Sequence, residues 1–297
     1  FFLADNGYDV WLGCHRGTSF SRGHITLNSN TDIRFWDFSF HEMGLYDFTA
    51  MVDHARMVSG NEKIFVIAHS QGASAFLVAT SEIPSMNEQI HAAYLFAPGA
   101  FEGGLYEPIT AALLPIVGTP TERLLYNLLG GRFSLRDTSR LTSALGIGRL
   151  AICQPKAIRC GVCDVYTLAP YYFNRAQQIM YVATNLPRMI AKLLDTGTFR
   201  SLFHFGQNAR SCMFRKTPSY NLSGISVPMY IFWGEQDASV TPPDIQRLAN
   251  NLPSAALRAV IRVNDDTFEH LDFLLHEMQR GSIFICLTLV LHYPFLS

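Results

Sequence analysis

Three residues of the types used for nucleophilic catalysis follow one another along the chain: Ser70, Asp237 and His270. A serine hydroxyl is a weak nucleophile at neutral pH. It becomes reactive when an imidazole takes its proton and a carboxylate orients that imidazole. Serine, then an acid, then histidine is the chain order of one large class of acyl-transfer enzymes. The three residues therefore predict acyl-transfer chemistry through a covalent intermediate on Ser70.

The surroundings of Ser70 favour it as the nucleophile. An apolar run over residues 64–67 precedes it, and a run of small and apolar residues over 73–78 follows it. A strand, a serine between small residues and a helix make a tight turn, the nucleophile elbow, which projects the hydroxyl from the end of a sheet. Strand and helix crowd together there, and the positions two before and two after the serine hold alanine and glycine. The alternative is an ordinary strand-to-helix turn with a capping serine.

The acid and the base each follow a further apolar run. Residues 227–234 are typical of a buried strand that ends at a glycine, and Asp237 lies on the loop after it. Residues 259–263 are typical of the next strand, and the loop after it leads into His270. Reactive groups gather at the carboxyl edge of a parallel sheet, so we expect both side chains beside Ser70.

Other carboxylates and histidines have plainer interpretations. With ten histidines in the chain, a single one is a weak signal. His69 adjoins the serine, but its side chain points another way at a sharp turn, and we interpret it as packing or polar lining. The remaining candidates are interpreted as a helix-surface histidine at His276, loop carboxylates at Asp265 and Asp266, a first-turn helix charge at Asp244, and a structural carboxylate at Asp272.

Further motifs follow one another in a recognisable order along the chain. They are residues 3–13, 16–17, 35–43, 46–47, 69–72, 95–98, 233–234 with Asp237, and 270–273. In this order they resemble the acid lipases, the group of the gastric and lysosomal lipases, although Cys14 stands where that family usually has asparagine. The resemblance covers roughly residues 1–275 and is strongest outside about 100–215. It implies a secreted or lysosomal esterase of lipids.

The resemblance and the alternation of strands and helices imply one fold class. It is the α/β-hydrolase fold, with a mostly parallel sheet, helices on both faces and a helical cap insertion. Strands are expected at residues 8–12 and 91–96 besides those above, and a helix at 44–58. About 130 residues separate the strand at 91–96 from the next, far more than a simple crossover needs.

That long insertion predicts three domain segments: core at residues 1–98, cap at 99–226 and core again at 227–297. Helix-like stretches lie at 109–114 and 177–194 within the cap. The resemblance implies that the cap covers a hydrophobic groove and opens toward a lipid surface. The alternative is a helical insert with a structural role that never moves.

The expected mechanism is acyl transfer to water. Ser70 attacks the ester carbonyl, His270 takes and returns the proton, and Asp237 holds the imidazole. The backbone N–H of Gln71 donates to the oxyanion. A second donor is unassigned, because no His-Gly-apolar sequence precedes Tyr8. The resemblance implies triacylglycerol or cholesteryl ester as substrate, and the alternatives are a non-catalytic lipid-binding or regulatory relative and acyl transfer to an alcohol.

The amino-acid composition limits the classes of partner that this protein is expected to have. The chain has 297 residues, of which 48% are hydrophobic and 16% charged, with a net charge of -1. That charge balance, without a basic stripe, argues against a nucleic-acid partner. The longest apolar run, residues 283–291, is shorter than the roughly 20 residues of a membrane helix. We also expect a monomer that needs no cofactor, and the resemblance implies that it meets a lipid ester at a lipid–water interface.

Six cysteines and one sequon bear on the compartment. The resemblance implies a disulfide between Cys153 and Cys160, whose spacing is close to that of the family's single bridge. Cys163 competes as a partner for Cys153, and a zinc site at Cys160 and Cys163 would need a second ligand pair, which is not evident. Asn221 begins a glycosylation sequon at a position where the family also carries one, which favours the secretory route.

The resemblance also implies that the N-terminal strands and the oxyanion loop are missing. The chain begins at Phe1 in what resembles a helix end, without Met or signal peptide. One missing strand would lie between the strands at 8–12 and 64–67. Two facing edges of unpaired groups would then destabilise the protein by about 1–3 kcal/mol per buried group and leave it nearly inactive. Residues 281–297 are interpreted as an alternative terminus or a buried final segment.

Overall fold

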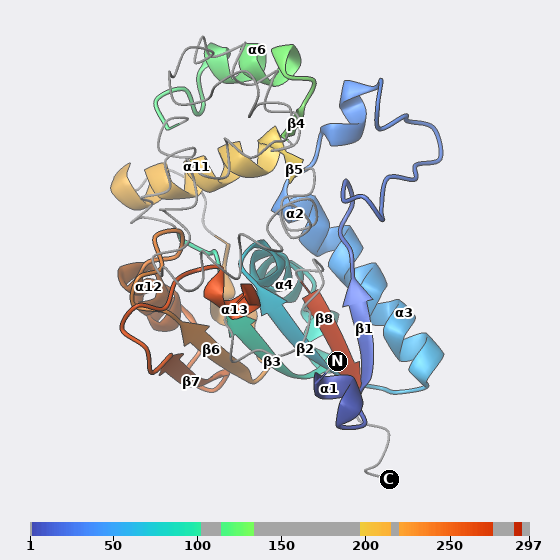
Figure 1. Cartoon of the computed structure of the whole chain (residues 1–297), viewed down its shortest axis with the longest axis vertical. Coiled ribbons are helices and arrows are strands. Elements are labelled where there is room, and N and C mark those ends of the chain that lie inside the picture. Colours follow the sequence, from blue (N-terminus) through green and yellow to red (C-terminus); the bar gives the residue numbers. More distant parts are fainter. Residues whose placement is uncertain (1, 102–113, 134–196, 215–219, 276–287, 293–297) are drawn as a thin grey trace, which may run out of the picture.

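A six-stranded sheet forms the centre of the computed structural model (Figure 1). The structure describes residues 2–101, 114–133, 197–214, 220–275 and 288–292. The strand order is β1-β8-β2-β3-β6-β7. The bounds of these strands are β1 (Asp9–Gly13), β2 (Ile64–His69), β3 (Ile90–Phe96), β6 (Met229–Trp233), β7 (Leu257–Arg262) and β8 (Thr288–His292). The pairs β2–β3, β3–β6 and β6–β7 are parallel, which confirms the expected mostly parallel α/β sheet.

The strand β8 corrects one expectation. It lies between β1 and β2, at the place where we predicted two facing strand edges without partners. It runs antiparallel to both, with Val290 opposite Trp11 on one side and opposite Val66 on the other. The backbone groups of β1 and β2 are therefore paired by the ladders of β8, and the predicted destabilising gap is absent from the described sheet. The segment 281–297 thus includes a central strand.

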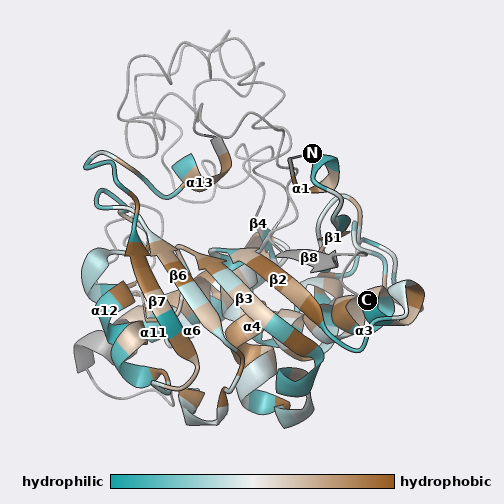
Figure 2. Ribbon diagram, turned by 90° about the horizontal axis from the view of Figure 1, so that it is seen from below, coloured by the Kyte–Doolittle hydropathy of each residue, from teal (hydrophilic) through white to brown (hydrophobic). Residues whose placement is uncertain are grey.

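The larger helices of the core cover one face of this sheet. Figure 2 shows α3 (Thr49–Ser59), α4 (Gln71–Glu82) and α12 (Pro242–Asn251) along that face, with the short α1 (Phe2–Asp5) and α13 (Asp272–Leu275) on the opposite side. The expected helix at 44–58 is a π-helical segment, η2 (Met43–Phe48), that continues into α3. It ends at Gly60, whose φ of 73° is the left-handed conformation that commonly closes a helix.

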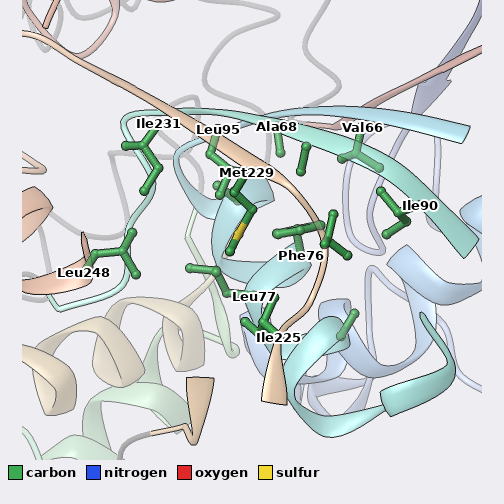
Figure 3. Close-up of a cluster of buried hydrophobic side chains, with 14 of the residues drawn as sticks. Val66, Ala68, Phe76, Leu77, Ile90, Leu95, Ile225, Met229, Ile231 and Leu248 are labelled. Atoms are coloured by element: carbon green, nitrogen blue, oxygen red, sulfur yellow. The ribbon is translucent and has the colours of Figure 1, made fainter. Parts of the chain in front are cut away.

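The core between these helices and the sheet is apolar throughout. Figure 3 shows the buried side chains of α4 meeting those of β2, β3 and β6. The core includes six side chains with 0% exposure: Val66, Phe76, Leu95, Met229, Ile231 and Leu248. Strands buried in this way are rich in apolar residues without strict alternation, which is why the sequence revealed them as continuous runs.

Short helices lie between the core and a second layer. They are η1 (Ile33–Trp36), α2 (Phe40–Glu42) and η5 (Leu222–Gly224), whereas η3 (Pro84–Gln89) joins α4 to β3 within the core. The second layer holds α6 (Pro120–Leu128), β4 (Arg132–Phe133), β5 (Gly197–Thr198) and α11 (Phe199–Phe214), which lie together at one end of the molecule (Figure 1). These elements fall in the predicted cap.

The second layer is attached to the core by polar contacts. Thr198 Oγ1 donates to the Trp36 carbonyl at 2.7 Å, and His204 Nδ1 lies 3.0 Å from Ser39 Oγ. The division at 98 and 226 stays a prediction, and the helix-like stretch 177–194 lies outside the described residues. In the part that the structure describes, no helix is long and apolar enough to cross a membrane.

Close packing of η2 against α4 gives a test of the fold. A Cβ at Gly44 would lie 2.6 Å from the Ala75 carbonyl oxygen and 2.6 Å from the Val78 Cβ. We expect Gly44→Ala to lower the free energy of unfolding by about 1–3 kcal/mol, because η2 and α4 must separate. Gly23→Ala is the control, since its Cβ would meet no atom within 4 Å. Denaturant unfolding measures both variants, and equal stability would contradict this packing.

Candidate active site

Ser70 lies at the turn between β2 and α4, as predicted. Its backbone has φ 51° and ψ −119°, a conformation that non-glycine residues rarely adopt. The turn is held by a hydrogen bond from the Ser70 N–H to the Phe96 carbonyl at 2.9 Å. Gly72, two residues on, is buried where α4 leaves the strand. This is the strained geometry of a nucleophile elbow, and it directs the hydroxyl away from the strand end.

The three predicted residues are joined by hydrogen bonds. His270 Nε2 lies 2.8 Å from Ser70 Oγ, and His270 Nδ1 lies 2.8 Å from Asp237 Oδ2. Asp237 follows β6, His270 follows β7 and Ser70 follows β2, so residues up to 200 positions apart meet at one edge of the sheet. The carboxylate can only accept, which places a proton on Nδ1 and leaves Nε2 free to accept the serine proton.

Backbone donors fix the carboxylate of Asp237. Its Oδ1 accepts from the N–H of Ser239 at 2.9 Å and from the N–H of Val240 at 2.7 Å. Asp237 is 3% exposed. Because two N–H groups hold one oxygen, the other oxygen is directed at the imidazole, and the ring orientation of His270 follows from it.

Comparison with known proteins agrees with this geometry. Residues 2–277 match the sequence profile described as the alpha/beta hydrolase fold. The chain belongs to the α/β-hydrolase family.

Several lipases are similar to this α/β-hydrolase. Lipase 1 of Drosophila melanogaster is 27% identical over 287 residues, which cover 92% of this chain and 61% of that protein. Gastric triacylglycerol lipase of Rattus norvegicus is 29% identical over 286 residues, covering 92% and 69% respectively. The predicted resemblance to the acid lipases is thereby confirmed. The chain spans less than two thirds of the length of Lipase 1.

One solved structure that is similar to this chain is a soluble variant of monoglyceride lipase from Saccharomyces cerevisiae. It has a TM-score of 0.49 at 14% identity, and the alignment covers 88% of this chain and 69% of that one.

The loops that carry Asp237 and His270 are hydrogen-bonded to each other. The Phe268 carbonyl accepts from the N–H of Gln236 at 3.0 Å, one residue before Asp237. A Cβ at Gly234 would lie 2.4 Å from that same carbonyl oxygen, so only glycine permits this approach. The glycine that ends the predicted strand therefore has a physical role in this α/β-hydrolase: it lets the two loops come together.

The competing residues lie elsewhere. Asp266 pairs with Arg262 and is solvent-exposed, with 87% of its side chain accessible. Asp272 accepts from the Glu269 N–H at 2.8 Å and is buried, which fits the predicted structural carboxylate beside the base. Asp265 accepts from Thr267 on its own loop, Asp244 completes a capping box at the start of α12, and His276 lies outside the described residues.

The predicted oxyanion donor, the backbone N–H of Gln71, lies at the start of α4. Gln71 is the first residue of α4, and the first N–H groups of a helix have no partner within the helix. Its side chain reaches the second layer, because Nε2 donates to Ser201 Oγ at 3.3 Å. The role of the Gln71 N–H stays a prediction, and the second donor stays unassigned.

Sequence reasoning missed the groups that orient the three residues. The N–H groups of Ser239 and Val240 and the carbonyl of Phe268 belong to the backbone, which carries no signal in residue identity. His69 was interpreted as packing or polar lining, and its Nε2 lies 3.0 Å from the His270 carbonyl oxygen, a contact that the sequence did not predict. The alternation of side chains along a strand could have revealed this contact. His69 is the last residue of β2 and therefore points to the face opposite that of Ala68.

The predicted disulfide and the zinc alternative fall on Cys153, Cys160 and Cys163, all outside the described residues. Cys14, after β1, is disulfide-bonded. Asn221 is exposed, and its Oδ1 accepts from the Ser223 N–H at 3.1 Å. Within the described ranges, no group of three or more His, Cys, Asp or Glu side chains is arranged to hold a metal ion.

A cavity of about 420 Å³ lies where α11 meets α2, and none of the three hydrogen-bonded residues lines it. His204 lines it, stacked on Phe40 with ring centroids 4.1 Å apart. Burial, followed by the nearby charge of His41, lowers the pKa of His204 to about 4. The ring is therefore neutral in the folded protein over the range in which a histidine of an unfolded chain becomes charged.

This lowered pKa predicts a pH-dependent stability. Between pH 6.5 and about 4 the unfolded chain binds a proton at His204 that the folded protein does not, so stability falls as the pH falls through this window. We expect His204 to lower the free energy of unfolding by about 2 kcal/mol from pH 7 to pH 5. Urea unfolding at both pH values measures the change. His204→Phe keeps the ring stack and should weaken the dependence; an unchanged slope would contradict the assignment.

Proposed function

We propose that this α/β-hydrolase cleaves carboxylic esters of lipids through an acyl-enzyme on Ser70. The observation that carries the proposal is the pair of 2.8 Å hydrogen bonds that connect Ser70, His270 and Asp237. The lipid substrate class rests on the similarity to lipases, among them one named for triacylglycerol. Triacylglycerol and cholesteryl ester are the proposed substrates, met at a lipid–water interface by a monomer.

The proposed steps balance protons at each stage. Ser70 Oγ bonds to the ester carbonyl carbon while its proton moves to His270 Nε2, and the carbonyl oxygen becomes an oxyanion near the Gln71 N–H. The imidazolium, stabilised by Asp237, returns the proton to the departing alcohol, which leaves the acyl group on Ser70. Water then repeats the sequence, with His270 as its base, and releases the carboxylic acid. Each oxyanion donor typically contributes about 3–4 kcal/mol to the transition state.

A fluorophosphonate probe tests the nucleophile directly. The probe phosphonylates a serine only when a neighbouring base activates it, so peptide mapping of the intact chain should find the label on Ser70. Two controls accompany it: the urea-unfolded protein and His270→Ala, both of which should lose the label. A chain that folds cooperatively but takes no label at Ser70 would overturn the proposed function.

A second candidate function is lipid binding without turnover. The two functions separate in a burst experiment with a soluble p-nitrophenyl ester. Continued turnover supports the lipase, whereas a labelled serine with no turnover supports the binding relative.

We further propose a secreted or lysosomal location, and one prediction follows from it. Asn221 is exposed just before the strand β6, so an oligosaccharyltransferase can reach it. Protein secreted from a eukaryotic host should lose mass at the peptide of Asn221 after glycosidase treatment, and Asn221→Gln should not. A bare Asn221 together with free thiols at Cys153 and Cys160 would point to a cytosolic enzyme instead.

A further inference from the structure

His69, the last residue of β2, lies directly under the candidate base. Its side chain is buried, with 5% exposure. Its ring centroid lies 4.8 Å from that of His270 and 6.0 Å from that of Phe273. The strand period decides this placement: Ala68 points into the core on one face, so His69 points to the face on which the His270 loop lies.

A hydrogen bond connects this ring to the backbone of His270. His69 Nε2 lies 3.0 Å from the carbonyl oxygen of His270. A carbonyl oxygen can only accept, so Nε2 carries the proton and donates it. The other nitrogen, Nδ1, is buried and has no hydrogen-bond partner among the residues that the structure describes. Burial, with a contribution from the charge of His270, holds the pKa of His69 well below its usual value, so the ring keeps this neutral form as the pH falls.

The connection closes a short path between nucleophile and base. His69 precedes Ser70 in the chain, and its ring bonds the backbone of His270, whose own Nε2 lies 2.8 Å from Ser70 Oγ. Any shift of the His270 backbone away from β2 would have to break the His69 hydrogen bond. The hydrogen bond of His69 therefore holds the loop of His270 at the same end of β2 that carries Ser70.

We infer that His69 is a positioning residue, whose Nε2–H group holds the His270 backbone so that the imidazole stays within hydrogen-bond reach of Ser70. The inference rests on the proposed function for its effect on turnover. The predicted effect of His69 on the orientation of the His270 ring rests on geometry alone. The competing explanation is that His69 only fills space between Phe273 and the sheet.

Two substitutions separate the hydrogen bond from the packing. His69→Gln places an amide N–H the same number of bonds from Cβ as Nε2, so it keeps a donor. His69→Met has a similar reach without a donor. His91→Met is the matched control, because His91 is an exposed histidine on the neighbouring strand β3.

Steady-state kinetics on a short-chain p-nitrophenyl ester give the first readout. We expect His69→Met to lower kcat about 10- to 100-fold with little change in KM, since a displaced base slows chemistry more than binding. His69→Gln should recover kcat to within about threefold of the parent, and His91→Met should match the parent. Equal losses in the Gln and Met variants, or a parental kcat in the Met variant, would overturn the inference. His69→Leu replaces the Met variant if that protein melts below the assay temperature.

Histidine NMR gives a readout that needs no turnover. In protein labelled with ¹⁵N-histidine, the His270 Nδ1 proton bonded to Asp237 should give a downfield line in the parent and in His69→Gln. That line should broaden or shift in His69→Met. If the parent neither turns over ester nor takes the phosphonate label, the proposed function is wrong. The NMR comparison of the parent with His69→Met still tests the positioning role in that case. An unchanged line in the Met variant would overturn it.

Discussion

Alanine at Ser70 or at His270 is expected to remove ester turnover, with a loss of about 10⁴-fold or more in kcat for each variant. Without the hydroxyl no acyl-enzyme can form. Without the imidazole the hydroxyl keeps its proton, because the Nε2 atom that lies 2.8 Å from Ser70 Oγ is its nearest base. Initial rates on a soluble ester measure both variants, and the double variant should lose little more than either single one, because the two residues act as a unit.

The matched control for Ser70→Ala is Ser81→Ala. Ser81 lies near the other end of α4 and donates to the Val78 carbonyl at 3.1 Å, so it shares the helix but not the site. Its variant should keep the parental rate. Near-parental turnover by Ser70→Ala would show that the reaction uses another nucleophile.

Asparagine at Asp237 is expected to lower kcat by about 10⁴-fold. The amide has almost the shape of the carboxylate. Its oxygen can still accept from the N–H groups of Ser239 and Val240, which directs the NH₂ group at His270 Nδ1. Two donors would then face each other, so the ring must move its proton to Nε2 and can no longer accept one from Ser70. The protein should stay folded, which circular dichroism checks beside the rate.

Asp266→Asn is the control for the acid. Asp266 lies on the loop before His270, pairs with Arg262 and has an accessible carboxylate, so its loss should change kcat by less than about twofold. The opposite result, a severe Asp266→Asn and a mild Asp237→Asn, would move the acid to Asp266 and contradict the site described above.

Much of this site could be predicted from the sequence because its signals are local. The apolar runs at β2, β6 and β7 mark strands, of which β7 is a largely exposed edge strand, and small residues two positions either side of Ser70 mark a crowded turn. In a parallel sheet, residues that follow neighbouring strands meet at one edge. That rule brings Asp237 and His270 to Ser70 without any knowledge of distances.

What could not be predicted depends on contacts between distant backbone groups. Two backbone N–H groups hold Asp237, and the Phe268 carbonyl packs closely against Gly234. Neither kind of contact can be recognised from residue type. The position of β8 was missed for a related reason: an apolar, β-branched segment shows that a strand is possible, whereas the neighbours it chooses depend on which edges are open. The role of His69 needed the strand face and the loop position together.

The place of β8 has a consequence for how the protein is made. Its residues, Thr288–His292, follow β2 by about 220 positions, yet they pair with both β1 and β2. At a synthesis rate of about 5–20 residues per second, the ribosome adds β8 roughly 10–45 s after β2. During that interval the nascent chain carries two strand edges that await a common partner, and open edges invite pairing with other chains. The junction between β1 and β2 therefore forms last, so a chaperone that shields these two strands during translation should raise the folded yield more than one added after release.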